Sequence, residues 1–249
     1  MENKIRPFPF LSGNVLKYIA ALSMLLDHIG IIFFPRATVF RILGRLALPI
    51  FAYMIAEGCR YTKNKLRYFL CVFGLAVACQ AVYFIYEQQL YLSVLFTFSL
   101  AILMIYALQF FKKCVFDKDR PAIKPILAAL LFVVSVEAVY LLNVYLTIDY
   151  GFWGCMLPVF ASLLHPTENM PNRLKKADRP YVHTLLLGVG LLMMLLFGKT
   201  MKVQIYSLLS LPLLLLYSGK RGRYGMKYFF YIFYPVHLAA LELISMLIK

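Results

Sequence analysis

The chain has 249 residues, of which 62% are hydrophobic, and its mean hydropathy of +0.76 excludes an ordinary soluble domain. Its formal net charge is +15. The basic residues lie in short segments between apolar stretches, a pattern that favours membrane topology and anionic lipid over a nucleic-acid partner. The ~10-residue alternating segments of a transmembrane barrel are absent. We therefore predict an all-α, polytopic transmembrane helical bundle that forms a single domain over residues 1–249.

Apolar stretches recur from residue 14 to residue 248, most of them long enough to cross a hydrocarbon core of about 30 Å as a helix. The second stretch carries charges and the sixth is short. No short apolar core with a small-residue cleavage site precedes them, so we expect the first span to be retained. The nine predicted spans lie near residues 14–34, 41–59, 69–86, 92–111, 125–146, 150–164, 182–198, 203–217 and 228–248.

Lysine and arginine are distributed unevenly between the two predicted sides of the membrane. The side that carries the N-terminus holds 20 of these 26 residues, and the opposite side holds 6. By the positive-inside rule the N-terminus is cytoplasmic and the C-terminus lies outside, which agrees with nine spans. The basic side consists of the segments 1–17, 60–68, 112–124, 165–181 and 218–227.

The first span contains an acid beside an imidazole, Asp27 and His28, in the stretch "MLLDHIGIIFF" (24–34). At ~1.5 Å per residue the pair lies roughly 20 Å from the inner edge of the span, in the outer half of the membrane. His28 is a candidate general base, because imidazole titrates near neutral pH. We count Asp27 among the candidate catalytic residues, with His28 and Arg45, and expect it to neutralise an arginine. The alternative is a structural polar contact between helices.

The second span, "RILGRLALPIFAYMIAEG" (41–58), places Arg41 and Arg45 on one helical face. Pro49 cannot bond the carbonyl of Arg45, so the helix should kink there and free that carbonyl, and Gly44 lets another helix approach closely. Two guanidinium groups on a kinked helix can hold anionic or carbonyl oxygen. The alternative is that both arginines snorkel to the outer headgroups. Glu57, an acid inside the same span, is a further candidate for substrate binding.

The last span, "YFFYIFYPVHLAALELI" (228–244), carries Tyr234, Pro235 and His237. Tyr234 and His237 are candidates for substrate binding. The alternative is an aromatic belt at the membrane surface, followed by a kinked packing helix. The cysteines form neither a CxxC pair nor a cluster with zinc spacing, so we predict no metal site. The basic segments are expected to orient the chain and contact lipid, or else to hold a phosphorylated cytoplasmic donor.

Three motifs occur in a fixed order: "LKYIAALSMLLDHIG" (16–30), "RILGRLALPIFAYMIAEGCRYT" (41–62) and "GKRGRYGMKYFFYIFYPVHLAAL" (219–241). With "DYGFWGC" (149–155), they resemble the TraX family of bacterial membrane proteins over residues 14–245. The resemblance implies membrane-embedded acyl transfer, since the family's namesake is tied to N-terminal acetylation of conjugative F pilin. The family is similar to wider transmembrane acyltransferases that use cytoplasmic acyl-CoA and an early-helix histidine, which is His28 here.

From the residues and the resemblance we expect an acyltransferase of the bacterial cytoplasmic (inner) membrane. Acyl-CoA, most simply acetyl-CoA, is the expected donor, and an amine or hydroxyl of a peptide, a pilin N-terminus or a glycan is the expected acceptor. His28 would remove the acceptor's proton and Arg45 would stabilise the oxyanion. An acetyl-histidine intermediate is the alternative route. We expect the lipid bilayer as a partner, no nucleic acid and no permanently bound cofactor.

Two other functions fit the same buried charges. A small-solute or proton-coupled transporter would share the buried acids and kinked helices, although the two halves of the chain show no inverted repeat. A non-catalytic assembly factor would pack against the helices of a partner and would bind no acyl-CoA.

Overall fold

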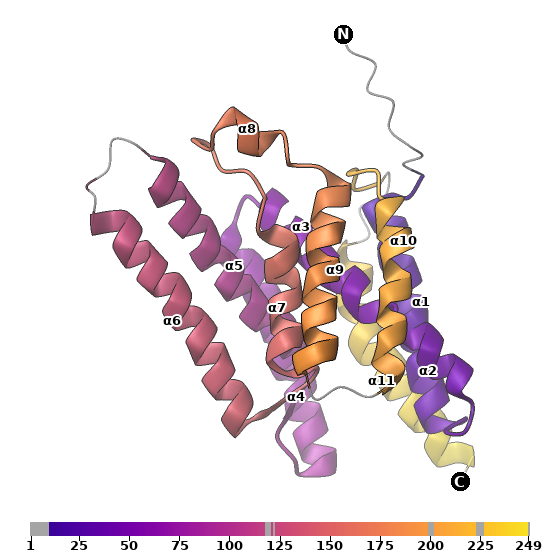
Figure 1. Ribbon diagram of the computed structural model, residues 1–249. Helices are drawn as coiled ribbons and strands as arrows, with labels where there is room; N and C mark the ends of the chain where they lie inside the picture. The colour runs from indigo at the N-terminus through magenta and orange to yellow at the C-terminus, as the bar shows by residue number, and fades with distance from the viewer. Residues whose placement is uncertain (1–9, 118–120, 122, 199–201, 223–226, 249) are drawn as a thin grey trace. The chain divides into compact units, whose positions relative to one another are not determined.

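The computed structural model describes residues 10–117, 121, 123–198, 202–222 and 227–248, and they are almost entirely helical (Figure 1). The elements in chain order are α1 (Gly13–Ile32), α2 (Thr38–Gly44), α3 (Ala47–Tyr61), α4 (Lys65–Glu87), β1 (Tyr91–Leu92), α5 (Val94–Phe116), α6 (Ile123–Tyr145), β2 (Thr147–Ile148), α7 (Gly151–Ser162), α8 (Asn172–Lys175), α9 (Pro180–Phe197), η1 (Lys202–Leu209), α10 (Ser210–Leu215) and α11 (Lys227–Ile248). The N-terminal segment 1–9 and part of the basic segment 218–227 lie outside the described residues.

Each of the nine predicted apolar stretches coincides with helical structure. Seven helical segments in the described part of the chain are long and apolar enough to cross a membrane. The helices Gly151–Ser162 and Lys202–Leu215 are apolar but shorter. The protein is therefore a helical, polytopic membrane protein, as predicted. The number of spans and the side on which each terminus lies stay predictions.

The second span is disturbed at the place where its proline predicts a kink, but the helix ends there and a new helix begins. Helix α2 ends at Gly44, Arg45 and Leu46 form a turn, and α3 begins at Ala47. Pro49 explains the position, because a proline nitrogen cannot donate to the carbonyl four residues earlier. The turn leaves Arg45 at the end of α2.

The chain divides into two compact units, which we describe separately. Unit 1 comprises Met1–Phe51 and Lys202–Lys249, and unit 2 comprises Ala52–Met201. Helix α3 begins in unit 1 and ends in unit 2. The prediction of a single domain stays a prediction.

Unit 1 is built around α1, which packs against α2 and α11, while α2 also contacts η1. The helix begins after Ser12, whose hydroxyl accepts a hydrogen bond from the Val15 amide and so caps one of the helix's free N–H groups. Its apolar sequence then runs without a proline to Ile32. Because the chain leaves α2 and returns through η1 to α11, residues from the two ends of the sequence surround α1.

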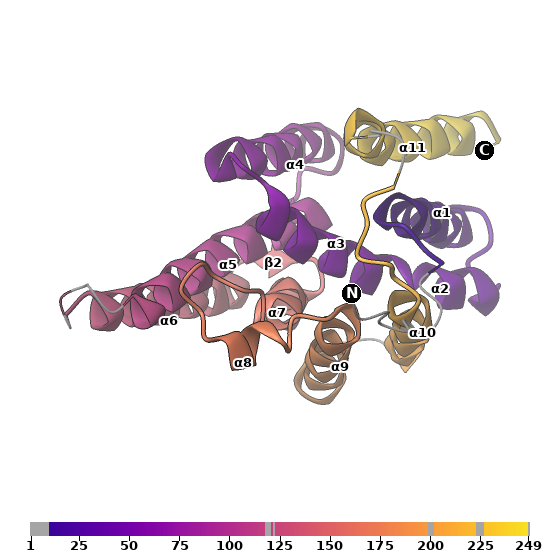
Figure 2. The ribbon, with the colours of Figure 1, turned by 90° about the horizontal axis from the view of Figure 1, so that it is seen from above.

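Unit 2 is organised around α5, which packs against α4, α6 and α7, while α7 packs against α9 (Figures 1 and 2). A two-residue parallel pairing of β1 with β2 joins the ends of α5 and α7. Only 11% of the most apolar part of α6 is buried, whereas half of α5 is. An apolar helix that exposes its side chains in this way is suited to contact lipid.

Candidate functional site

Unit 1 holds an ion-paired cluster around Asp27, a residue of α1. One carboxylate oxygen of Asp27 lies 3.1 Å from a guanidinium nitrogen of Arg41, and the other lies 2.5 Å from one of Arg45. Asp27 and Arg45 are 8% and 6% exposed. The predicted pairing of Asp27 with an arginine is therefore present, and its predicted place in catalysis stays a prediction.

Gly44 permits this pairing. A Cβ atom added at Gly44 would collide with the Cβ and the carboxylate of Asp27. The close helix approach that Gly44 predicts is therefore observed. The residue of the neighbouring helix that lies against Gly44 is Asp27.

Arg45 is held by two further contacts. Its guanidinium donates to the side-chain oxygen of Gln204 at 3.1 Å and to the carbonyl of Arg41 at 3.3 Å. Arg45 is thus enclosed in unit 1, with a side chain 7% exposed, and does not snorkel as an isolated charge, whereas the side chain of Arg41 is 20% exposed. Gln204 lies in η1, and a single amide in an apolar stretch carries no sequence signal that could have identified it.

The side chain of His28 lies next to that of His237, which comes 209 residues later in the chain. The Nδ1 atom of His28 is 2.8 Å from the carbonyl of Met24, and that of His237 is 2.8 Å from the carbonyl of Phe233. Carbonyl oxygens only accept hydrogen bonds, so we assign the ring hydrogen of each neutral imidazole to Nδ1. The Nε2 atom of each ring then carries a lone pair.

The two imidazoles also contact each other. Nε2 of His237 lies 3.4 Å from Nδ1 of His28, and the ring centroids are 5.1 Å apart. The ring of Tyr234 lies 5.7 Å from that of His237. His28 Nε2 has no hydrogen-bond partner among the residues that the structure describes. This nitrogen is therefore an available proton acceptor, and α11 supports the ring that carries it.

Taken together, the Asp27 cluster (Asp27, His28, Arg41, Arg45, Gln204 and His237) combines a neutral base with a net positive charge. One carboxylate and two guanidinium groups sum to +1. Such an arrangement can accept a proton at an imidazole while cationic groups stabilise negative charge on an oxygen.

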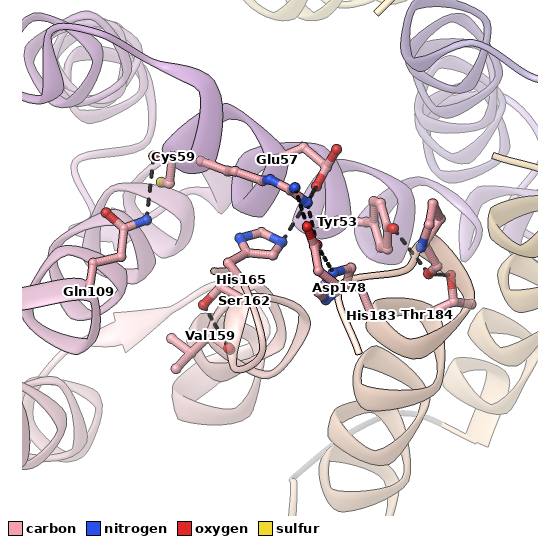
Figure 3. Close-up of polar contacts among 12 residues, drawn as sticks. Tyr53, Glu57, Cys59, Gln109, Val159, Ser162, His165, Asp178, His183 and Thr184 are labelled. Carbon is pink, nitrogen blue, oxygen red and sulfur yellow. Dashed lines mark hydrogen bonds and ion pairs between the residues drawn. The ribbon is translucent and has the colours of Figure 1, made fainter. Parts of the chain in front are cut away.

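Glu57 does not join the other predicted site residues. It lies in the part of α3 that belongs to unit 2, where it is 7% exposed. Its carboxylate is 3.4 Å from Nε2 of His165 (Figure 3). The guanidinium of Arg60 lies 3.8 Å from the same carboxylate. Its predicted role in substrate binding stays a prediction, but its neighbours differ from those of Asp27.

Around Glu57 the structure reveals a second group of charges, in which Arg60 and Asp178 are partly exposed. Arg60 forms a bidentate ion pair with Asp178, with N–O distances of 2.8 and 2.6 Å. Asp178 also accepts a hydrogen bond from Nε2 of His183 at 3.0 Å. The rings of His165 and His183 pack edge to face, with centroids 4.6 Å apart. These five residues, Glu57, Arg60, His165, Asp178 and His183, form the Glu57 cluster.

The surroundings shift the pKa of two members of the Glu57 cluster. Burial lowers the pKa of His165 to about 4 and outweighs the hydrogen bond to Glu57, which acts in the opposite direction. Burial alone would raise the pKa of Asp178, but the His183 hydrogen bond and the Arg60 charge outweigh it and hold the pKa below its usual value. At neutral pH His165 is therefore uncharged and Asp178 is ionised.

The loop that carries His165 is anchored by a buried lysine. Lys112, on α5, donates hydrogen bonds to the carbonyls of Ser162, Leu163 and His165 at 2.9–3.2 Å. These carbonyls lie at and just beyond the C-terminal end of α7, where cations interact favourably with the helix. Lys112 therefore fixes the backbone from which His165 reaches Glu57.

Sequence reasoning missed most of the Glu57 cluster. His165 and His183 stand alone in the sequence, without the spacing of metal ligands or of a catalytic motif. Arg60 and Asp178 lie in basic segments whose expected role is to orient the chain in the membrane. Within the described residues, no group of three or more His, Cys, Asp or Glu side chains is arranged to hold a metal ion.

The chain matches the model of the TraX protein family over residues 12–245. It is similar to a probable fimbrial assembly protein, FimC of serogroup H1, from Dichelobacter nodosus, with 27% identity over 92% of this chain and 94% of that protein. It is also similar to an uncharacterized protein of Rickettsia prowazekii (strain Madrid E), with 39% identity over 22% of this chain and 21% of that protein. No solved structure matches the chain. The ordered motifs and this nearly complete match lead to one conclusion: the chain belongs to the TraX family.

Proposed function

We propose that the protein is a membrane acyltransferase that moves an acyl group, in the simplest case acetyl, from cytoplasmic acyl-CoA to an amine or hydroxyl acceptor. One observation carries the proposal. His28 presents an unprotonated Nε2 beside two arginines that share one aspartate. A base and a cationic oxygen site are the two functions that acyl transfer requires.

In the proposed reaction, His28 Nε2 takes a proton from the acceptor nitrogen or oxygen as that atom attacks the thioester carbonyl. The carbonyl oxygen becomes an oxyanion near the arginines. Collapse of this intermediate breaks the carbon–sulfur bond, and the imidazolium returns its proton to the departing thiolate of CoA. Attack by His28 itself, to give an acyl-histidine, is the other route with the same products.

We assign different roles to the two arginines. Arg45 is enclosed by Asp27, Gln204 and the Arg41 carbonyl, so it supplies a fixed positive charge. Arg41 is the more exposed of the two and is the better placed to contact the substrate. Asp27 holds both guanidinium groups, and His237 and Tyr234 line the acceptor side of His28.

The predicted orientation supplies the route for the substrates. With the N-terminus in the cytoplasm, the basic segments face the compartment that contains acyl-CoA and can hold its phosphates as point charges. The Asp27 cluster then lies in the outer half of the bacterial inner membrane, where an acceptor enters from outside. The relative described as a probable fimbrial assembly protein supports an acceptor on a fimbrial subunit, for which we propose the N-terminal amine.

The direct test is consumption of acetyl-CoA by the purified protein in detergent, with pilin-like peptides and glycans as acceptors. We expect CoA release that depends on the acceptor and falls about a thousandfold in His28→Ala, because a general base contributes 10²–10⁴-fold. Leu22→Ala, a truncation of an exposed side chain on the same helix, is the control that keeps activity.

Full activity in a folded His28→Ala variant would exclude the proposed base. Solute counterflow without acyl transfer would favour a transporter, and the absence of acyl-CoA binding would favour a non-catalytic assembly factor. Arg45→Lys should retain the charge but lose the planar fork that joins Asp27 to Gln204, so transfer should fall sharply.

A further inference from the structure

We propose that α6 is a docking surface for a transmembrane helix of another protein, and that this helix carries a lysine or arginine at the depth of Glu137. The surface lies outside the residues assigned to acyl transfer, so its occupancy can be measured without acyl-CoA. Three observations support it: the depth of Glu137 in its helix, the lack of a partner for its carboxylate, and the spacing of the exposed residues around it.

Glu137 is an ionisable residue well inside an apolar helix. The 23 residues of α6 are enough to cross a hydrocarbon core of about 30 Å. Glu137 comes eight residues before the last residue of this helix, Tyr145, which corresponds to about 12 Å of helix at ~1.5 Å per residue. It is further still from the other end. Ionisable groups at such a depth are rare, and they face the interior of a bundle or pair with one another.

Glu137 does neither of these things in unit 2. Its side chain is exposed, and it has no hydrogen-bond or ion-pair partner among the residues that the structure describes. The buried residues of α6, Ala128 and Val139, lie about 180° and 160° around the helix from it, at 100° per residue. The carboxylate therefore points away from α5 and α7, which pack against α6. Figures 1 and 2 show α6 as the outermost helix of unit 2, beside α5.

The exposed side chains around Glu137 have the spacing of a helix–helix contact. Alternating steps of four and three residues place side chains along the line where one helix packs against another in a coiled coil. The other residues at these steps are between 48% and 63% exposed, so unit 2 leaves the whole line uncovered. We call this line the α6 seam, and it consists of Ile126, Leu130, Val133, Glu137, Tyr140 and Val144.

The charge of Glu137 decides which occupant fits the α6 seam. Lipid chains can cover its apolar residues, but they offer a carboxylate no hydrogen bond. A second copy of this chain, related by a two-fold axis along the membrane normal, would place its own Glu137 opposite the first, and like charges repel. A partner helix with a lysine or arginine at this depth supplies both a positive charge and N–H donors. Arg41 and Arg45 are not available for this role, because Asp27 holds both.

The test uses the full-length protein in phospholipid nanodiscs and a synthetic transmembrane peptide. The peptide has about 20 residues of leucine and alanine, with one lysine at the depth of Glu137. A second peptide with norleucine in place of the lysine is the matched probe, because it has a side chain of similar length without the charge. Energy transfer between labelled protein and labelled peptide measures association. We expect saturable binding of the lysine peptide, about tenfold tighter than that of the norleucine peptide.

Two pairs of variants locate the surface. Glu137→Gln should reduce binding of the lysine peptide to the level of the norleucine peptide, whereas Glu242→Gln, which removes an exposed acid from α11, should leave it unchanged. Val133→Trp should block the α6 seam. Leu131→Trp adds the same side chain at an exposed position about 120° around the helix from Glu137, and should not block it. Since all four substitutions replace exposed side chains, each variant is expected to fold.

Three results would overturn the inference. Equal binding of the two peptides, or binding of neither, would mean that lipid alone covers the α6 seam. Lysine-peptide binding that survives in Glu137→Gln or in Val133→Trp would place the docking surface elsewhere. Energy transfer between two labelled copies of the protein that is lost in Val133→Trp would make the occupant a second copy of this chain.

Discussion

The two clusters contain the same kinds of residue and reach opposite electrostatic states. The Asp27 cluster has one carboxylate for two arginines, whereas the Glu57 cluster has two carboxylates for one arginine. Each cluster contains a pair of histidines. His28 and His237 donate through Nδ1 to carbonyls of their own helices, whereas His165 and His183 donate through Nε2 to carboxylates.

This difference shows that the partner of an imidazole decides its chemistry. A histidine that bonds its own helix leaves Nε2, the atom at the tip of the ring, as the acceptor. A histidine that bonds a carboxylate through Nε2 leaves Nδ1, the atom nearest the backbone, as the acceptor. An acceptor at Nε2 is suited to a base that reaches a substrate. An acceptor at Nδ1 lies close to the backbone and is suited to contacts within the protein.

The largest expected change in stability comes from Asp27→Asn. It leaves Arg41 and Arg45 without their shared anion in a buried site, which costs about 3 kcal/mol of unfolding free energy. Asp178→Asn should cost less, because both Asp178 and Arg60 are more exposed than Asp27 and Arg45. Thermal unfolding in detergent measures both. A larger loss for Asp178→Asn would reverse the comparison between the clusters.

Gly44→Ala should disrupt the Asp27 cluster without altering a charged group. The new methyl group would collide with Asp27, and accommodating it costs about 2 kcal/mol. Gly74→Ala, on α4, is the matched control, since an added Cβ there meets nothing within 4 Å. That variant should be unchanged or more stable by up to about 1 kcal/mol. Equal effects of the two substitutions would show that Gly44 does not set the helix approach.

Acid should weaken unit 2 through His165. Its pKa falls from 6.5 to about 4 on folding, so between these values the unfolded chain binds a proton that the folded chain does not. This contribution to stability is complete above pH 6.5 and is lost as the pH falls toward 4, by about 2 kcal/mol between pH 7.5 and pH 5. The carboxylate of Asp178 adds a loss only below its unfolded pKa of 3.8.

Unfolding midpoints in detergent across this pH range measure the effect. In His165→Gln the slope between pH 7.5 and pH 5 should become shallower, because the titrating group is gone. An unchanged slope in that variant would assign the pH dependence to another group.

The smallest effect is expected for the ion pair of Lys113 with Glu168, at 3.6 Å, whose side chains are 48% and 83% exposed. Solvent screens such pairs, so Glu168→Gln should leave the unfolding midpoint unchanged within error. A clear loss of stability would mean that solvent screens this ion pair less than the exposure of its two side chains indicates.

Much of the Asp27 cluster could be predicted because its signals are local. Arg41 and Arg45 lie four residues apart, Pro49 interrupts the helix at Arg45, and Asp27 is a charge inside an apolar span. The partnership of Gln204 and the meeting of His28 with His237 could not be predicted, because each joins segments separated by more than 150 residues. The sequence identifies Glu57 as an acid inside an apolar span, but it does not identify the residues that contact it.

The sequence by itself determined the class of the protein and the helical segments, because a helix satisfies its own backbone in lipid and needs only a long apolar run. It also determined the position at which the second span departs from a straight helix, since proline acts on its own chain. The tertiary structure alone decided that the buried charges separate into a cationic and an anionic cluster, and which nitrogen of each histidine remains an acceptor. Those properties depend on atoms brought together from distant helices and loops, and no spacing along the chain records them.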